Sequence, residues 1–155
     1  MSKRPAALWV LFGVLLFQGI SALAPGVMLV VDPSGALLGM SPAALQGGPF
    51  HDYLIPGIIL AVVLGLGPLL VAAGLLLLPD WPWLERLNPR KEMHWSWPGA
   101  LLLGLGLMIW ILVQVVIIGP GSWLQPFYFA IGLLILLLCF APSARAHLRF
   151  WRRHR

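Results

Sequence analysis

WPGALLLGLGLMIWILVQVVIIGPGSWLQPFYFAIGLLILLLCFA, residues 97–141, contains no aspartate, glutamate, lysine or arginine. A helix that crosses the hydrocarbon core of a bilayer needs about 20 mainly apolar residues, so this stretch is long enough for two. The string Gly-Pro-Gly-Ser at 119–122 divides it, because glycine and proline interrupt helices and favour tight turns. The stretch therefore predicts two membrane-spanning helices, at 98–118 and 123–141, joined by a short turn.

Two more uncharged stretches precede it, at 6–31 and 53–79. The first predicts a helix over 6–24, since Pro25 follows, and the second predicts a helix over 53–78 with a kink at Pro68. Only 10% of the 155 residues are charged, against about 25% in soluble domains. The predicted fold class is therefore an all-α membrane protein, one integral domain over 1–155 built as a four-transmembrane-helix bundle.

The start of the chain also has the features of a secretory signal peptide. Lys3 and Arg4 precede an apolar core, and Ala22-Leu23-Ala24 has the small residues of a cleavage site. Pro25, directly after Ala24, argues against cleavage, and the apolar stretch is long enough to span a bilayer. A retained helix is therefore the favoured interpretation over a cleaved signal.

The connections differ in character. The outer loop, 25–52, is apolar and contains a turn signal at Asp32-Pro33-Ser34-Gly35. Ser41 followed by Pro42 predicts the start of a short helix in this loop. A loop so rich in apolar residues is expected to lie along the membrane surface or to cap the bundle. The loop at 79–96 is rich in tryptophan and charge, and 142–155 forms a basic tail.

Small residues recur at helical spacing. Gly57, Ala61 and Gly65 are four residues apart, and Ala100 and Gly104 repeat the pattern in the next predicted helix. Helices in membranes approach closely where small residues share a face, because packing replaces the hydrophobic effect there. These faces are therefore predicted to be helix–helix contacts.

The basic residues predict the orientation in the membrane. All ten lysines and arginines lie in the N-terminal segment, the 79–96 loop or the tail, and none lies in 25–52 or 119–122. Cytoplasmic loops carry the excess of basic residues, so both termini are predicted to be cytoplasmic and the protein to lie in the inner, or cytoplasmic, membrane. Beside a membrane, basic side chains favour anionic lipid headgroups as partners, and no nucleic acid partner is expected.

Polar side chains concentrate toward the predicted outer half of the helices. Polar groups inside spans are costly and suggest function by default. They predict a ligand-binding pocket that opens outward and comprises Gln18, Asp32, His51, Asp52, Tyr53, Trp110, Gln114, Gln125 and Tyr128. Trp110 would form a wall of this pocket, and Asp52 is both the plausible cap of the second helix and the first choice for a functional group. The structural alternative is that these groups only join neighbouring helices or sit at the membrane interface.

The sequence gives little support for a metal site or a catalytic site. A structural zinc site takes four ligands, and the His51–Asp52 pair offers two. Cys139 has no charged neighbour that would activate its thiol. No catalytic motif or cofactor motif is present, so no catalytic residue, metal or cofactor is predicted, and enzymatic activity is not favoured.

The overall plan, with the DPSG turn at 32–35 and the stretch FHDYLIPG at 50–57, resembles small four-helix bacterial inner-membrane proteins and is similar in outline to DoxX-like proteins. The resemblance brings no catalytic motif with it. The leading functional hypothesis is the binding of a lipid or small apolar ligand, or of a membrane partner, at the outer face. A small oligomeric transporter and a DoxX-like redox or assembly accessory are the alternatives.

Overall fold

The computed structural model describes residues 4–153, and these residues form helices and loops without a β-strand. The long elements are α1 (Ala6–Val31), α5 (Ser96–Ile118), α6 (Leu124–Phe140) and a continuous span made of α2 (Leu54–Ile58), η3 (Ile59–Leu66) and α3 (Gly67–Leu77). Three helices are long and apolar enough to cross a membrane, or four if α6 and the helix bent from it count as one span. The all-helical fold is thus confirmed, and three or four of its described helices have the length and apolar composition that a membrane span requires.

Helix α1 is longer than predicted. The expectation that it ends at Ala24, with the outer loop beginning at Pro25, is wrong: the helix continues through Pro25 to Val31, and the Asp32 N–H closes it on Met28 O. Proline removes one backbone hydrogen bond, but membrane helices tolerate this where neighbouring helices compensate. The outer loop therefore starts at Asp32. Residues 25–31 extend α1 by about two turns, and these turns belong to the bundle.

The sequence predicts a kink at Pro68 in the second span, and the structure has a π-helix in the turns before this proline. Residues 59–66, just before the proline, form η3, in which the Gly67 N–H bonds to Val62 O five residues earlier. Proline lacks an N–H and its ring clashes with the carbonyl four residues back, which here is that of Leu64. The wider π-turns precede this position, so the span stays continuous from Leu54 to Leu77.

The small-residue face of the second span packs on α1, as predicted. A Cβ on Gly57 would lie 2.7 Å from Leu29 Cβ, and a Cβ on Gly65 would lie 3.0 Å from Leu23 Cα. Both distances are too short for a real side chain to fit without movement. Gly104 likewise meets α6 at Gly132 O, 3.1 Å from its built Cβ. Glycine thus allows the backbones of both helix pairs to approach closely.

The outer loop is held by local hydrogen bonds. The predicted turn at 32–35 is present, with Gly35 N–H bonded to Asp32 O at 3.1 Å and Gly35 at φ +81°, a conformation that suits glycine. Two 3₁₀ helices follow, η1 (Ala36–Leu38) and η2 (Pro42–Leu45), and Ser41 Oγ accepts from Ala43 N–H to cap the second. The predicted short helix is therefore η2.

The basic segments are more helical than predicted. The 79–96 loop contains α4 (Pro82–Leu87), and its last residue, Ser96, already begins α5. The tail forms a helix, α7 (Pro142–Arg153), which lies at an angle of 58° to α6. Its apolar side chains Ala144 and Leu148 are fully buried against the bundle, which is why the tail folds back. Residues 1–3 and 154–155, with Lys3 and Arg155 among them, lie outside the described residues.

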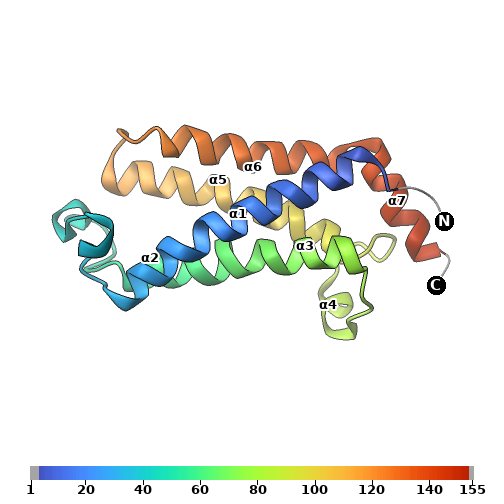
Figure 1. Ribbon diagram of the computed structural model, residues 1–155, viewed down its shortest axis with the longest axis horizontal. Helices are drawn as coiled ribbons and strands as arrows, with labels where there is room; N and C mark the ends of the chain where they lie inside the picture. Colours follow the sequence, from blue (N-terminus) through green and yellow to red (C-terminus); the bar gives the residue numbers. More distant parts are fainter. Residues whose placement is uncertain (1–3, 154–155) are drawn as a thin grey trace.

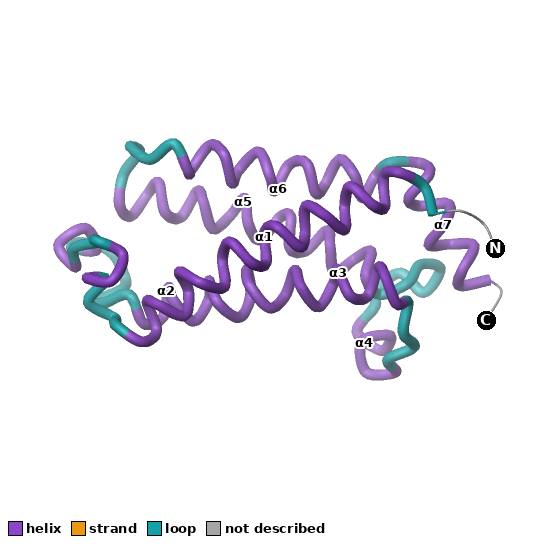
Figure 2. The backbone as a smooth tube through the Cα atoms, in the orientation of Figure 1, coloured by secondary structure: helices purple, strands orange, loops and turns teal. Residues whose placement is uncertain are grey.

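The two ends of the bundle differ in composition. Figure 1 shows both ends of the chain, α4 and α7 at one end, and the loop between α1 and α2 with the α5–α6 turn at the other; the loops in Figure 2 gather at the same two ends. Every described lysine and arginine lies in segments at the first end, which is called the basic end below. The other end, called the loop end, carries residues 32–53 and 119–123.

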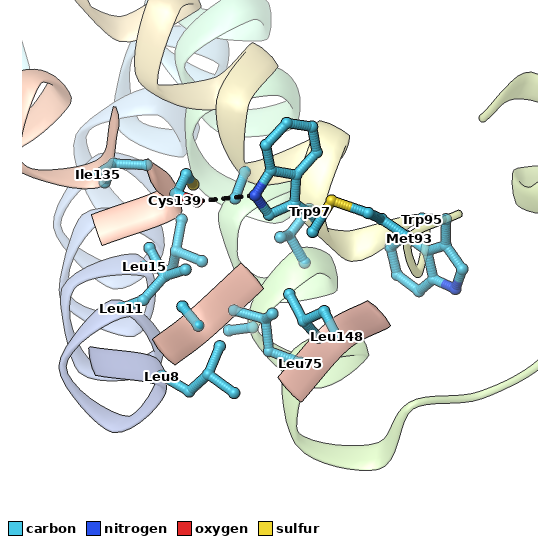
Figure 3. Close-up of a cluster of buried hydrophobic side chains, with 14 of the residues drawn as sticks. Leu8, Leu11, Leu15, Leu75, Met93, Trp95, Trp97, Ile135, Cys139 and Leu148 are labelled. Carbon is cyan, nitrogen blue, oxygen red and sulfur yellow. Dashed lines mark hydrogen bonds between the residues drawn. The ribbon is translucent and has the colours of Figure 1, made fainter. Parts of the chain in front are cut away.

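The basic end has a solid core. Side chains from α1, α3, α5, α6 and α7 fill it, as Figure 3 shows for Leu11, Leu75 and Leu148 among others. Trp97 Nε1 donates to the backbone oxygen of Cys139 at 2.8 Å across α5 and α6. Next to Arg4 the remaining space is only about 10 Å³. The hollow part of the molecule is therefore at the loop end.

Candidate functional site

A cavity of about 580 Å³ lies at the loop end, between α1, the second span, α5 and α6. This volume falls in the range of pockets that hold small molecules, roughly 300–1,000 Å³. Leu29, Leu60, Leu107 and Ile111 are among the side chains in its wall, and the outer loop contributes Leu38, Met40, Leu45 and Phe50. The apolar loop thus covers the bundle, the second of the two arrangements that the sequence suggested.

The structure brings six of the predicted site residues to this cavity. They come from three helices, α1, α5 and α6, and from the residue before α2. They are Gln18, Tyr53, Trp110, Gln114, Gln125 and Tyr128. None of the described residues in the wall is aspartate, glutamate, lysine, arginine or histidine. The wall is therefore mostly apolar and carries isolated neutral polar groups.

Three predicted residues lie elsewhere. Asp32, His51 and Asp52 are not in the wall of the cavity, and the expectation that Asp52 shares one interior volume with Gln18 and Gln114 is wrong. Asp32 Oδ1 instead accepts from Ser34 Oγ at 2.6 Å, and this hydrogen bond is the main cause of a lowered pKa of the Asp32 carboxyl. The carboxylates of Asp32 and Asp52 stay at the surface and accept hydrogen bonds from nearby turn residues. They stay there because ionised carboxylates are costly to bury.

Asp52 has a local role. Its side chain is exposed, and its Oδ1 accepts from the N–H of Leu54, the first residue of α2, at 2.9 Å. This bond satisfies one of the free donors at the helix start. The N-cap of α2 is Tyr53, so the prediction that Asp52 holds this position is wrong by one residue. An amide oxygen can accept the same bond, so the carboxylate charge is not required for it.

We expect Asp52→Asn to leave the apparent melting temperature in mild detergent nearly unchanged, since asparagine caps as well as aspartate. Asp52→Ala, which removes the acceptor, should cost about 1 kcal/mol. Thermal unfolding followed by circular dichroism measures both. A large loss in Asp52→Asn alone would mean that the charge itself has a partner.

Tyr53 and Gln125 support the cavity from its two sides. Tyr53 is 3% exposed and its hydroxyl donates to Ser41 O at 2.9 Å, which ties the outer loop to the start of the second span. Gln125 is buried, and its Nε2 donates to Gly119 O at 3.1 Å, which braces the α5–α6 turn. These two polar groups are thus occupied by structural hydrogen bonds.

Gln18 is the most deeply buried polar group of the site, with 2% of its surface exposed. Its Nε2 donates to Leu64 O at 3.4 Å, the carbonyl that Pro68 cannot bond as the α-helical pattern would require. Its Oε1 is buried with no hydrogen-bond partner, and so is Nε1 of Trp110 on α5. Both atoms are therefore enclosed by the surrounding protein and are not open to the cavity.

Sequence reasoning missed most of the apolar wall. Pro25 and Leu29 were expected in a loop, yet they lie on α1 and line the cavity. Phe50 and Leu45 come from the outer loop. The signal that could have located them is the apolar character of that loop, because a solvated loop would not carry so many large apolar side chains.

Among the described residues, no three histidine, cysteine, aspartate or glutamate side chains gather into a metal-binding group. Comparisons with protein-family models, with curated proteins and with solved structures found no match. The cavity's own geometry is therefore the basis for assigning a function.

Proposed function

We propose that the protein binds a lipid-like, mainly apolar molecule in the cavity at the loop end. The observation that carries this proposal is a volume of about 580 Å³ whose described wall has no charged side chain. Transfer of a ligand's apolar surface from water into such a cavity is favourable, by about 25 cal/mol per Å² of surface removed from water. The few neutral polar groups then orient the guest.

The proposal includes an orientation. The described basic residues all belong to the end that carries both chain ends and α4, while the loop end has none. Under the positive-inside rule, both termini face the cytoplasm, the bundle spans the inner membrane four times, and the cavity lies on the extracytoplasmic side. At the basic end, Arg145 and Arg149 on α7 would meet anionic lipid headgroups.

A transport function is less well supported than binding. A transporter needs access to its site from both sides of the membrane. The core at the basic end is tightly packed, with Leu11, Leu15 and Ile135 all at 0% exposure. A binding protein or an accessory that presents a lipid to a membrane partner needs only the outer opening.

Filling the cavity tests the proposal. Ile117 lines the cavity on α5, whereas the adjacent Val116 is 84% exposed on the outside of the bundle. We expect Ile117→Trp to lower the amount of bound lipid-like molecule roughly tenfold or more, because overlap with a bound guest costs about 1–3 kcal/mol or more. Native mass spectrometry of protein released from lipid nanodiscs measures the bound molecule.

Val116→Trp is the matched control, since it adds the same side chain one residue away but toward lipid. It should keep the wild-type level of bound molecule. Equal occupancy in Ile117→Trp and Val116→Trp would place any bound molecule outside the cavity and refute the proposed function.

A further inference from the structure

Most polar side chains in the cavity wall are engaged with the protein itself. The hydroxyls of Ser21 and Tyr53 donate to backbone carbonyl oxygens, and Ser122 Oγ accepts from a backbone N–H. The Nε2 atoms of Gln18 and Gln125 also donate to carbonyl oxygens. These groups hold helices and loops in place, so they are weak candidates for recognition of a guest.

Gln114 on α5 is different. Its half-buried side chain lines the cavity, and its amide makes no hydrogen bond to a described residue. Neither amide atom is among the enclosed polar atoms, so both are open to a molecule the size of water. The amide thus offers a donor, Nε2, and an acceptor, Oε1, to a molecule that enters the cavity.

Gln114 lies nearer the opening of the cavity than the apolar part of the wall does. The exposed wall residues Ile118, Ser122 and Leu124 gather at the α5–α6 turn, so the cavity opens at the loop end. Leu107 precedes Gln114 by two turns on the same face of α5 and lies about 10 Å deeper, at about 1.5 Å of rise per residue. The side chains around Leu107 form a buried apolar cluster. The cavity is therefore apolar at depth and offers a free amide near its opening.

The free amide and the uncharged wall together restrict the head group of the guest. An amide pairs best with a group that both donates to its oxygen and accepts from its nitrogen, as a hydroxyl or a carboxamide does. An ionised head group would lie against a wall whose described residues carry no counter-charge, which is unfavourable. An uncharged head is therefore favoured, and a hydrocarbon chain suits the apolar depth.

We propose that the guest is an uncharged amphiphile whose hydroxyl or carboxamide head binds the Gln114 amide and whose hydrocarbon chain extends inward to Leu107. This inference rests on the proposed function, because it specifies the guest of the same cavity. In the orientation proposed above, the head faces the extracytoplasmic side and the chain points toward the middle of the bilayer. A lipid of the outer leaflet points in the same direction, so the guest enters the cavity without inverting.

The test compares Gln114→Met with the wild type, using probes that share a chain and differ in head group. Methionine keeps the unbranched shape of glutamine but removes the amide. We expect the affinity for dodecanol and for dodecanamide to fall roughly tenfold, as for the loss of a buried hydrogen bond, and the affinity for dodecane to stay unchanged. Native mass spectrometry of protein released from lipid nanodiscs measures each bound probe. Each probe partitions equally into the bilayer around both proteins, so the ratio of variant to wild type isolates the contact.

Two further variants are the controls. Gln46→Met makes the same change at an exposed residue of the outer loop, outside the cavity wall, and it should bind all three probes as the wild type does. Tyr128→Phe removes a hydroxyl that also lines the cavity without a hydrogen bond to a described residue, but that packs against the apolar cluster around Leu107. It should leave the binding of dodecanol and dodecanamide nearly unchanged.

The outcomes are distinct. A fall for only one of the two polar probes supports the proposal and identifies the head as a hydroxyl or a carboxamide. An equal fall for dodecane, or unchanged binding of both polar probes, would overturn the role of Gln114. A loss in Tyr128→Phe instead of Gln114→Met would place the head at the inner end of the cavity and overturn it as well. No binding of any probe, with Ile117→Trp and wild type alike, would instead refute the proposed function on which this inference rests.

Discussion

Gly26→Ala is expected to destabilise the bundle by about 3 kcal/mol or more, at the upper end of the cost of overpacking. A Cβ at Gly26 would lie 2.5 Å from Ala61 N and 2.7 Å from Ala61 Cα. These are backbone atoms, which cannot turn away as a flexible side chain can. Accommodating even one methyl group would force α1 and the second span apart along the contact that Gly57 in α2 and Gly65 in η3 also form.

Gly13→Ala is the matched control for this prediction. Gly13 is exposed on the same helix, and nothing lies within 4 Å of its built Cβ. Both substitutions gain the same helix propensity, so their difference isolates the packing contact. The apparent melting temperature in mild detergent, followed by circular dichroism, measures it. If Gly26→Ala melts together with Gly13→Ala, α1 does not pack on η3 as described.

Two single cysteines should give an all-or-none difference in labelling from outside the cell. Leu37 in η1 and Leu87 at the end of α4 are both exposed leucines, at opposite ends of the bundle. A membrane-impermeant maleimide on intact cells should label Leu37→Cys and leave Leu87→Cys unlabelled until the membrane is opened. The reason is the basic residues, which keep the α4 end in the cytoplasm.

The native Cys139 is at 0% exposure and should contribute little background, which the wild type measures. Leu37 is a better position than Gly35 in the same loop, because Gly35 has φ +81° and its built Cβ would lie 2.9 Å from the Tyr53 ring. Labelling of Leu87→Cys alone in intact cells would invert the orientation and place the cavity on the cytoplasmic side.

Much of the helical layout could be predicted from the sequence. The helices at 98–118 and 123–141 differ from α5 and α6 by no more than two residues at either end, and 53–78 matches the second span closely. A membrane span depends on apolar composition over about 20 successive residues, which is a local property. The Gly57–Ala61–Gly65 contact was also predictable, because helical spacing alone puts these residues on one face.

The candidate site was only partly predictable. The structure places Gln18, Trp110 and Gln114 in the wall of one cavity, and the sequence singles them out because polar groups in spans are costly. Asp52, the first choice, lies outside the cavity and accepts a hydrogen bond from the first N–H of α2. The amino-acid pattern shows that a polar group is near a helix end, but the direction in which its side chain points depends on the loop that precedes the helix.

The sequence by itself determined where apolar helices form and which end of the molecule is basic, since both follow from residues that are neighbours along the chain. Only the tertiary structure decided that α1 continues through Pro25, that Gly26 meets the Ala61 backbone, and that Gln18 bonds Leu64 O. Each of these depends on a contact between helices that are distant in sequence. The packing free energy of such a contact offsets the local cost of a proline or a buried amide. The contact cannot be predicted from residues that are neighbours along the chain.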